Sequence, residues 1–153
     1  MSPKSPLPPL SAHLGYWLRF VSNHVSYAFA RKLADKDVTA AEWVVMHELY
    51  GERAVAPSSL AERLGLTRGA ISKLADRLIQ KKLISREDSA SDLRAHTLTL
   101  TSAGTALVPI LATLADENDA EFFGDMTAKE RAALERVLKS LVARHGLKSI
   151  PMT

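Results

Sequence analysis

Basic and hydroxyl side chains recur at helical spacing along one short stretch of this chain. Within residues 67–82 they fall on the face opposite the apolar positions, such as Ile71, Leu74 and Leu78. Guanidinium and ammonium groups bind DNA phosphates and guanine edges, and short hydroxyl side chains allow close approach to bases. The polar face comprises Arg68, Ser72, Lys73, Asp76, Arg77 and Lys81. This pattern predicts a recognition helix that enters the major groove of double-stranded DNA.

The residues before this helix predict a first, shorter helix and a tight turn. Gly65 separates the two helices, because glycine adopts without strain the left-handed conformation that ends a helix. Ser59, three residues before Glu62, and Thr67, at the start of the second helix, are side chains that cap helix N-termini. A phosphate contact is compatible with capping at both positions, since helix N-termini attract anions. Thr39 opens an earlier helix in the same way.

An alternating pattern follows the recognition helix and indicates two strands. Ile84 and Arg86 begin it, and Thr97–Thr101 continue it beyond a polar segment at 88–95. Alternation of this kind is typical of half-buried strands, and two short strands joined by a polar loop form a hairpin. The helix-turn-helix with this hairpin predicts a winged helix-turn-helix.

Long apolar helices flank the predicted winged domain. The first covers residues 11–34, and later helices begin at Thr101 or Ser102 and at Thr127, the last one ending at Gly146. Their apolar faces are wider than a lone surface helix needs. We therefore expect these helices to pack against a second copy of the chain.

The predicted fold class is mostly α with a small β wing. The winged helix-turn-helix, a DNA-binding domain, would cover residues 38–101, and dimerisation helices would occupy 11–37 and 102–148. Residues 1–10 contain four prolines, which favours a flexible N-terminal arm. Residues 67–100 contain seven Lys/Arg against four Asp/Glu, so they hold the whole net charge of +3. The excess positive charge thus lies where DNA phosphates would bind.

Other classes of function lack support in the sequence. Cysteine is absent, which excludes disulfides and Cys-ligated metals. No P-loop, G-x-S-x-G or zincin spacing occurs, so we expect neither an enzyme nor a bound cofactor or metal. The acidic residues between Asp116 and Asp125 have no interleaved histidine and favour a solvated helix face over a metal site. Since no apolar run has the length of a signal peptide or membrane span, we expect a cytoplasmic protein.

The chain resembles the MarR family of bacterial transcription regulators over essentially its whole length. Three segments carry the resemblance: the helix-turn-helix at 60–78, an Asp-x-Arg wing within 86–94, and Leu-Thr-x-x-Gly within 98–104. The resemblance implies a homodimer that binds a pseudo-palindromic operator. Its recognition helices would enter successive major grooves, and each wing would place an arginine in a minor groove.

The resemblance also implies roles for individual residues. Asp92 would orient Arg94, the wing arginine, through a charge-assisted hydrogen bond. The alternative for Arg94 is a salt bridge that only stabilises the wing, and for Lys73 and Arg77 it is a solvated face. Lys82 stands where the family commonly has glycine, and a left-handed lysine there would cost roughly 1 kcal/mol. The predicted DNA-contacting residues are Ser59, Thr67, Arg68, Ser72, Lys73, Arg77 and Arg94.

A ligand pocket between the dimerisation and DNA-binding parts is a further implication. Aromatic and imidazole side chains on the first two helices would suit a small aromatic or phenolic effector. We favour the alternative that the tryptophans are core and that the histidines are exposed or hydrogen-bonded. The candidate effector-binding residues are His13, Trp17, His24, Trp43 and His47.

The sequence thus predicts a dimeric repressor or dual regulator that a small molecule releases from DNA. Two alternatives remain open. One is an architectural DNA-binding protein without an effector. The other is a winged-helix module whose basic face binds an acidic protein, and the salt dependence of affinity separates that module from a DNA-binding protein.

Overall fold

The computed structural model describes residues 6–88 and 96–150 as a mostly helical chain with one two-stranded antiparallel sheet. This confirms the predicted fold class. A single 3-10 turn, Leu10–Ala12, precedes the first long helix. The elements are, in order, α1 (Leu14–Ala34), α2 (Ala40–Leu49), α3 (Pro57–Leu64), α4 (Arg68–Gln80), β1 (Ile84–Asp88), β2 (His96–Leu100), α5 (Ser102–Phe123) and α6 (Ala128–Arg144).

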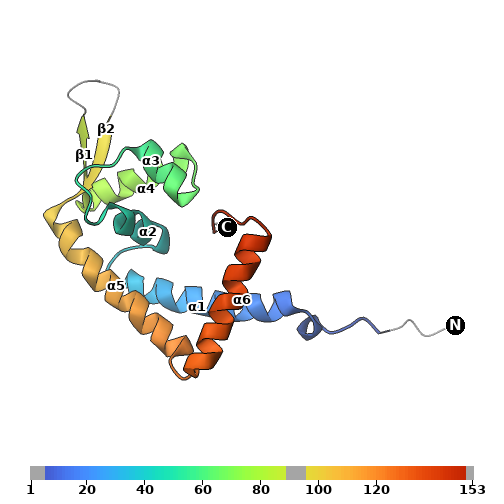
Figure 1. Ribbon diagram of the computed structural model, residues 1–153. Helices are drawn as coiled ribbons and strands as arrows, with labels where there is room; N and C mark the ends of the chain where they lie inside the picture. Colours follow the sequence, from blue (N-terminus) through green and yellow to red (C-terminus); the bar gives the residue numbers. More distant parts are fainter. Residues whose placement is uncertain (1–5, 89–95, 151–153) are drawn as a thin grey trace.

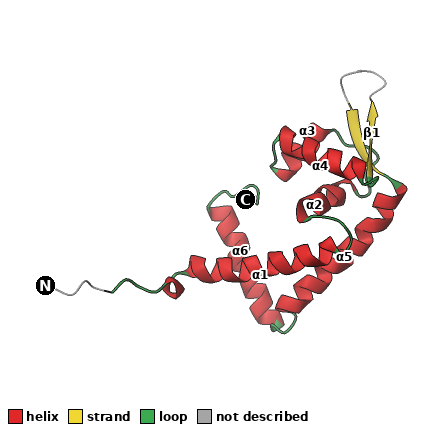
Figure 2. Cartoon of the chain, turned by 180° about the vertical axis from the view of Figure 1, so that it is seen from behind, coloured by secondary structure: helices red, strands yellow, loops and turns green. Residues whose placement is uncertain are grey.

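These elements gather at two ends of the molecule (Figure 1). The three helices α2, α3 and α4 lie with the β1–β2 hairpin at one end, and α1, α5 and α6 form the other. Helix α5 joins the two ends, because it contacts β2 and α2 as well as α1. The view from behind shows the same division, with α4 beyond α2 as seen from α1 (Figure 2). None of the helices in the described part of the chain combines the length and hydropathy needed to cross a bilayer.

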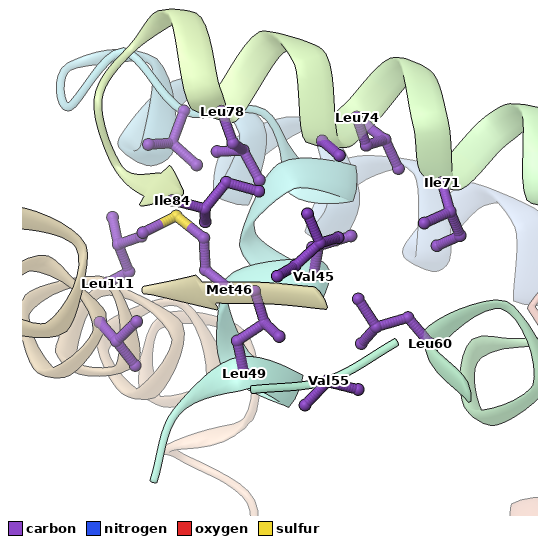
Figure 3. Packing of buried hydrophobic residues seen from close by; sticks show 14 of the residues in the cluster. Val45, Met46, Leu49, Val55, Leu60, Ile71, Leu74, Leu78, Ile84 and Leu111 are labelled. Carbon is purple, nitrogen blue, oxygen red and sulfur yellow. The ribbon is translucent and has the colours of Figure 1, made fainter. Parts of the chain in front are cut away.

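A buried apolar cluster beneath α4 fixes the direction of its polar face. Ile71, Leu74 and Leu78 project from α4 into this cluster, as the sequence pattern predicts. Figure 3 shows Leu78 beside Ile84 of β1, and Leu74 and Ile71 on the side of Val45 of α2. Because the apolar stripe is held inside, the opposite face of α4 points to solvent.

The predicted caps of α2, α4 and α6 are present. The hydroxyl of Thr39 accepts from the Glu42 N–H (3.1 Å), while the Glu42 carboxylate accepts from the Thr39 N–H (2.8 Å). Thr127 opens α6 with the same reciprocal pair. The hydroxyl of Thr67 accepts from the Ala70 N–H (3.1 Å). Each bond satisfies a backbone donor that a helix start leaves free.

The capping box predicted for Ser59 is wrong. Helix α3 begins at Pro57, with Ala56 as its N-cap and no side-chain cap. Proline at the first helical position is favourable, because its missing N–H would have had no partner there. Ser59 is therefore an ordinary residue inside the first turn.

Lys82 adopts the left-handed backbone conformation that glycine favours, as anticipated for this position between α4 and the first strand. Its φ is +61°, and it ends α4 through two backbone hydrogen bonds. The Lys82 N–H donates to the Ile79 carbonyl (2.9 Å), and the Leu83 N–H donates to the Leu78 carbonyl (3.0 Å). This is the Schellman arrangement, in which glycine is the most favourable residue.

Replacing Lys82 with glycine is therefore expected to stabilise the protein by about 1 kcal/mol, since glycine removes the left-handed strain. Urea denaturation at fixed protein concentration measures the change. Gln80→Gly is the control, because glycine at a helical position should cost roughly 1 kcal/mol instead. A destabilised Lys82→Gly protein would contradict the prediction.

Candidate nucleic-acid interface

The exposed face of α4 presents the cationic and hydroxyl groups predicted from the sequence. Arg68, Ser72, Lys73 and Arg77 are all exposed along one side of the helix. Thr67 is exposed at its start, where its hydroxyl is engaged in the cap. The predicted DNA-contacting residues of α4 and of its N-cap therefore lie on one accessible surface.

A groove of about 410 Å³ lies between α4 and the wing. Arg68 and Ser72 line it from α4, Ser58 from α3, and Arg86 and His96 from the two strands. Two guanidinium groups, an imidazole and two hydroxyls beside the exposed face of α4 extend the cationic surface toward the wing. Such groups bind phosphate oxygens, so the groove suits a nucleic-acid backbone.

Two groups in this groove were missed from the sequence. The sequence pattern marks Arg86 only as part of a strand, yet its Nη2 lies 3.1 Å from Asp76 Oδ1 on α4. This ion pair holds the guanidinium at the groove. Nothing in the sequence marks His96 as a functional residue, because it is only the first residue of a strand. Ser59 is half-buried, and its neighbour Ser58 lines the groove in its place.

The wing arginine and its partner fall outside the described residues. Arg94 and Asp92 both lie within 89–95, so their predicted roles remain predictions. The strands on either side are paired in register, from Ile84 with Leu100 to Asp88 with His96. The predicted hairpin is therefore present.

The candidate effector residues divide between two places. His13 and His24 line a hollow of about 670 Å³ on α1, together with Tyr16, Arg19 and Phe20. The rings of Phe20 and His24 stack with centroids 5.1 Å apart. All residues that line this hollow belong to α1 and the turn before it.

The remaining three candidates lie elsewhere. Trp43 and His47 contact each other on α2 with ring centroids 5.2 Å apart, and Trp43 packs against the core. Trp17 is 51% exposed and donates from its indole N–H to the Ser11 carbonyl (2.8 Å). In the single chain, Trp43 therefore packs against the core and Trp17 does not, and the effector roles of all five residues stay predictions.

No group of three or more side chains suited to a metal ion occurs within residues 6–88 and 96–150. Two of the acids on α5 form ion pairs at the surface. Asp119 pairs with Arg131, and Glu121 pairs with Lys32, each at 2.5 Å.

The chain is similar to several known proteins. A model of the MarR family matches residues 36–95, from the end of α1 into the wing. The multiple antibiotic resistance protein MarR of Escherichia coli is 27% identical over 130 residues, which cover 84% of this chain and 90% of that protein. A crystal structure of a mutant E. coli MarR complexed with operator DNA has a TM-score of 0.74 at 27% identity, covering 84% of this chain and 93% of that one.

A second similar structure concerns Bordetella bronchiseptica BpsR, whose DNA binding is regulated by 6-hydroxynicotinic acid. It has a TM-score of 0.75 at 24% identity and covers 89% of this chain and 97% of that chain. At this level of identity the likeness shows the shared fold alone.

Proposed function

We propose that this chain acts as a MarR-type transcription regulator rather than an enzyme, and that it binds pseudo-palindromic operator DNA as a homodimer. The observation that carries the proposal is the exposed cationic face of α4 above a fully buried apolar stripe. A face fixed in this way suits insertion into a major groove, with the groove beside Arg86 receiving the phosphate backbone.

Unpartnered apolar faces support the homodimer. Helix α6 has no buried residue, and α1 buries only Leu33 of its 21 residues. Large side chains on both helices are exposed, Leu14 at 88% and Val137 at 49%. Exposed apolar surface on this scale marks an interaction site. A second copy would cover it, and the two-fold axis would set the two α4 helices about one DNA turn apart.

Release by a small effector is the second part of the proposal. The hollow on α1 offers stacked rings, two imidazoles and the Arg19 guanidinium, which suit an aromatic or phenolic acid. An effector that prefers another separation of the two recognition helices would weaken DNA binding by its differential affinity. Bound to a promoter, the dimer would act as a repressor by blocking access.

The experiment that tests the proposal is selection of bound DNA from a random duplex pool, with wild type and Arg94→Ala in parallel. An inverted repeat with half-sites about one turn apart supports the dimeric regulator. Loss of preference for A·T-rich flanks in Arg94→Ala supports a minor-groove role for the wing. Weak, salt-insensitive retention without enrichment would point to the protein-interaction module.

Substitutions on α4 are expected to separate phosphate contacts from base contacts. Arg77→Ala should weaken operator and random DNA alike and reduce the salt slope by about one, while Ser72→Ala or Lys73→Ala should cost roughly 1–3 kcal/mol on the operator alone. Titrations at several salt concentrations on both DNAs measure this. Equal losses on both DNAs for all three variants would show that α4 makes no base contacts.

A further inference from the structure

Lys81, at the C-terminal end of α4, bonds to two other helix ends. Its Nζ donates to Glu42 Oε1 at the start of α2 (2.9 Å) and to the carbonyl oxygen of Asp37 after α1 (2.7 Å). The helical pattern assigns Lys81 to the DNA-facing side of α4, but its ammonium turns toward α2 instead. We call Asp37, Glu42 and Lys81 the Lys81 junction.

The junction is charged on both sides and partly buried. The Glu42 side chain is fully buried, and its Oε2 has no hydrogen-bond partner. Burial raises the pKa of Glu42, but the Thr39 N–H and the Lys81 ammonium lower it further than burial raises it. Glu42 is therefore an anion at neutral pH. Moving Lys81 away would leave that charge buried without its counter-ion, which is strongly unfavourable.

Backbone strain is concentrated at the same place. Asp37 (φ +56°) and Lys82 (φ +61°) are the two residues other than glycine with positive φ in the described part of the chain. One is a member of the junction, and the other follows Lys81 directly. Strained conformations persist where the surrounding structure holds them, and they cluster at functional and switch regions.

Helix α5 is attached to the same turn. The hydroxyl of Thr101, the N-cap of α5, donates to the Lys82 carbonyl (2.8 Å), and the Thr101 N–H donates to the Leu83 carbonyl (3.0 Å). The last turn of α4 is thus bonded to the end of α1 and to the start of α5. Both of these helices belong to the proposed dimerisation part.

The length of α4 makes the angle at this turn important. Its 13 residues span about 20 Å. A tilt of roughly 10° about the C-terminal end would move the N-terminal end by about 3.4 Å, which is the rise of one base pair. A small change at the junction would therefore change the half-site spacing that two recognition helices can fit.

We propose that Lys81 is a positioning residue that sets the angle of the recognition helix relative to the dimerisation helices, and thereby the half-site spacing that the dimer accepts. The inference rests on the proposed function, because spacing has meaning only for a dimer on an inverted repeat. It assigns Lys81 no contact with DNA.

The test compares spacing preference with stability. The double variant Glu42→Gln/Lys81→Met removes the ion pair and leaves no buried charge, and glutamine retains the capping box with Thr39. The matched control is Glu52→Gln/Arg63→Met, which removes an exposed ion pair of 3.2 Å from the same domain. Lys81→Arg, which retains the cation, is the conservative variant. Each protein is titrated on the selected operator, on operators with one base pair inserted or deleted at the centre, and on a single half-site, and its melting temperature is measured.

We expect the preference of the junction variant for the native spacing to fall about tenfold, within the range for coupling between sites. Its affinity for the single half-site and its melting temperature should stay close to those of wild type. The control should keep the wild-type spacing preference, and Lys81→Arg should retain most of it.

Unchanged spacing preference in the junction variant would overturn the inference. Equal losses of affinity on every DNA would also overturn it, because they would indicate a purely structural role. If wild type shows no preference for an inverted repeat, the proposed function itself fails, and the inference fails with it.

Discussion

Replacing Gly104 with alanine is expected to destabilise the protein by about 3 kcal/mol, at the upper end of the usual cost of overpacking. Gly104 is buried in the first turn of α5, and an added Cβ would overlap the carbonyl oxygen of Leu83. It would also lie 3.1 Å from Leu100 Cδ2. The Leu83 carbonyl is fixed, since it accepts the hydrogen bond from the Thr101 N–H. The added methyl group must therefore push α5 away from the turn that ends α4.

Thermal and urea denaturation at fixed protein concentration measure this loss, and the melting temperature should fall by roughly 10 °C. Gly69→Ala is the matched control, because the nearest atom to its added Cβ is the Thr67 hydroxyl oxygen at 4.0 Å. That variant should be as stable as wild type or slightly more stable. A Gly104→Ala protein with wild-type stability would contradict this prediction, because it would show that the Leu83 carbonyl leaves room for a methyl group on α5.

Features that depend on neighbouring residues could be predicted from the sequence. The apolar stripe of Ile71, Leu74 and Leu78 was enough to orient α4, because helical geometry alone places these side chains on one face. The caps at Thr39 and Thr67 were predicted for the same reason, since a cap bonds to a backbone N–H three residues away.

Ser59 shows where a local pattern fails. Ser59 and Glu62 have the correct residue types and spacing for a capping box, but Pro57 is equally suited to a helix start and begins α3 two residues earlier. Both start signals fall within one helical turn, and the local pattern alone does not decide at which of them the helix begins.

Contacts between distant segments could not be predicted. Helical spacing specifies the direction in which Lys81 leaves α4, but not that Glu42, 39 residues earlier, would be within reach of its ammonium. The pair of Asp76 and Arg86 is similar, because it requires the strand to return beside α4. A long side chain pairs with whichever group the folded chain brings within its reach. The Lys81 junction and the groove could therefore be found only in the structure.

Charge placed on the apolar face of α6 is expected to abolish the proposed dimer and with it operator binding. Val137 is half exposed in the single chain, and Leu134, Leu138 and Val142 of the same helix are also exposed. Val137→Glu would bury an unpaired carboxylate against the second copy, which is costly. With one recognition helix per molecule, affinity for the inverted repeat should fall by roughly 100-fold or more, because the second contact is no longer intramolecular. Affinity for a single half-site should be retained.

Sedimentation measures the oligomeric state of Val137→Glu and of the control Ala132→Glu, and operator titration measures their affinity for DNA. Ala132 lies on the opposite side of the same helix and is exposed, so its variant introduces the same charge and should remain a dimer with wild-type affinity. A dimeric Val137→Glu protein with full operator affinity would exclude this face of α6 from the interface. A monomer that still binds the inverted repeat as tightly as wild type would instead separate operator binding from dimerisation, because one α4 would then supply all of the affinity.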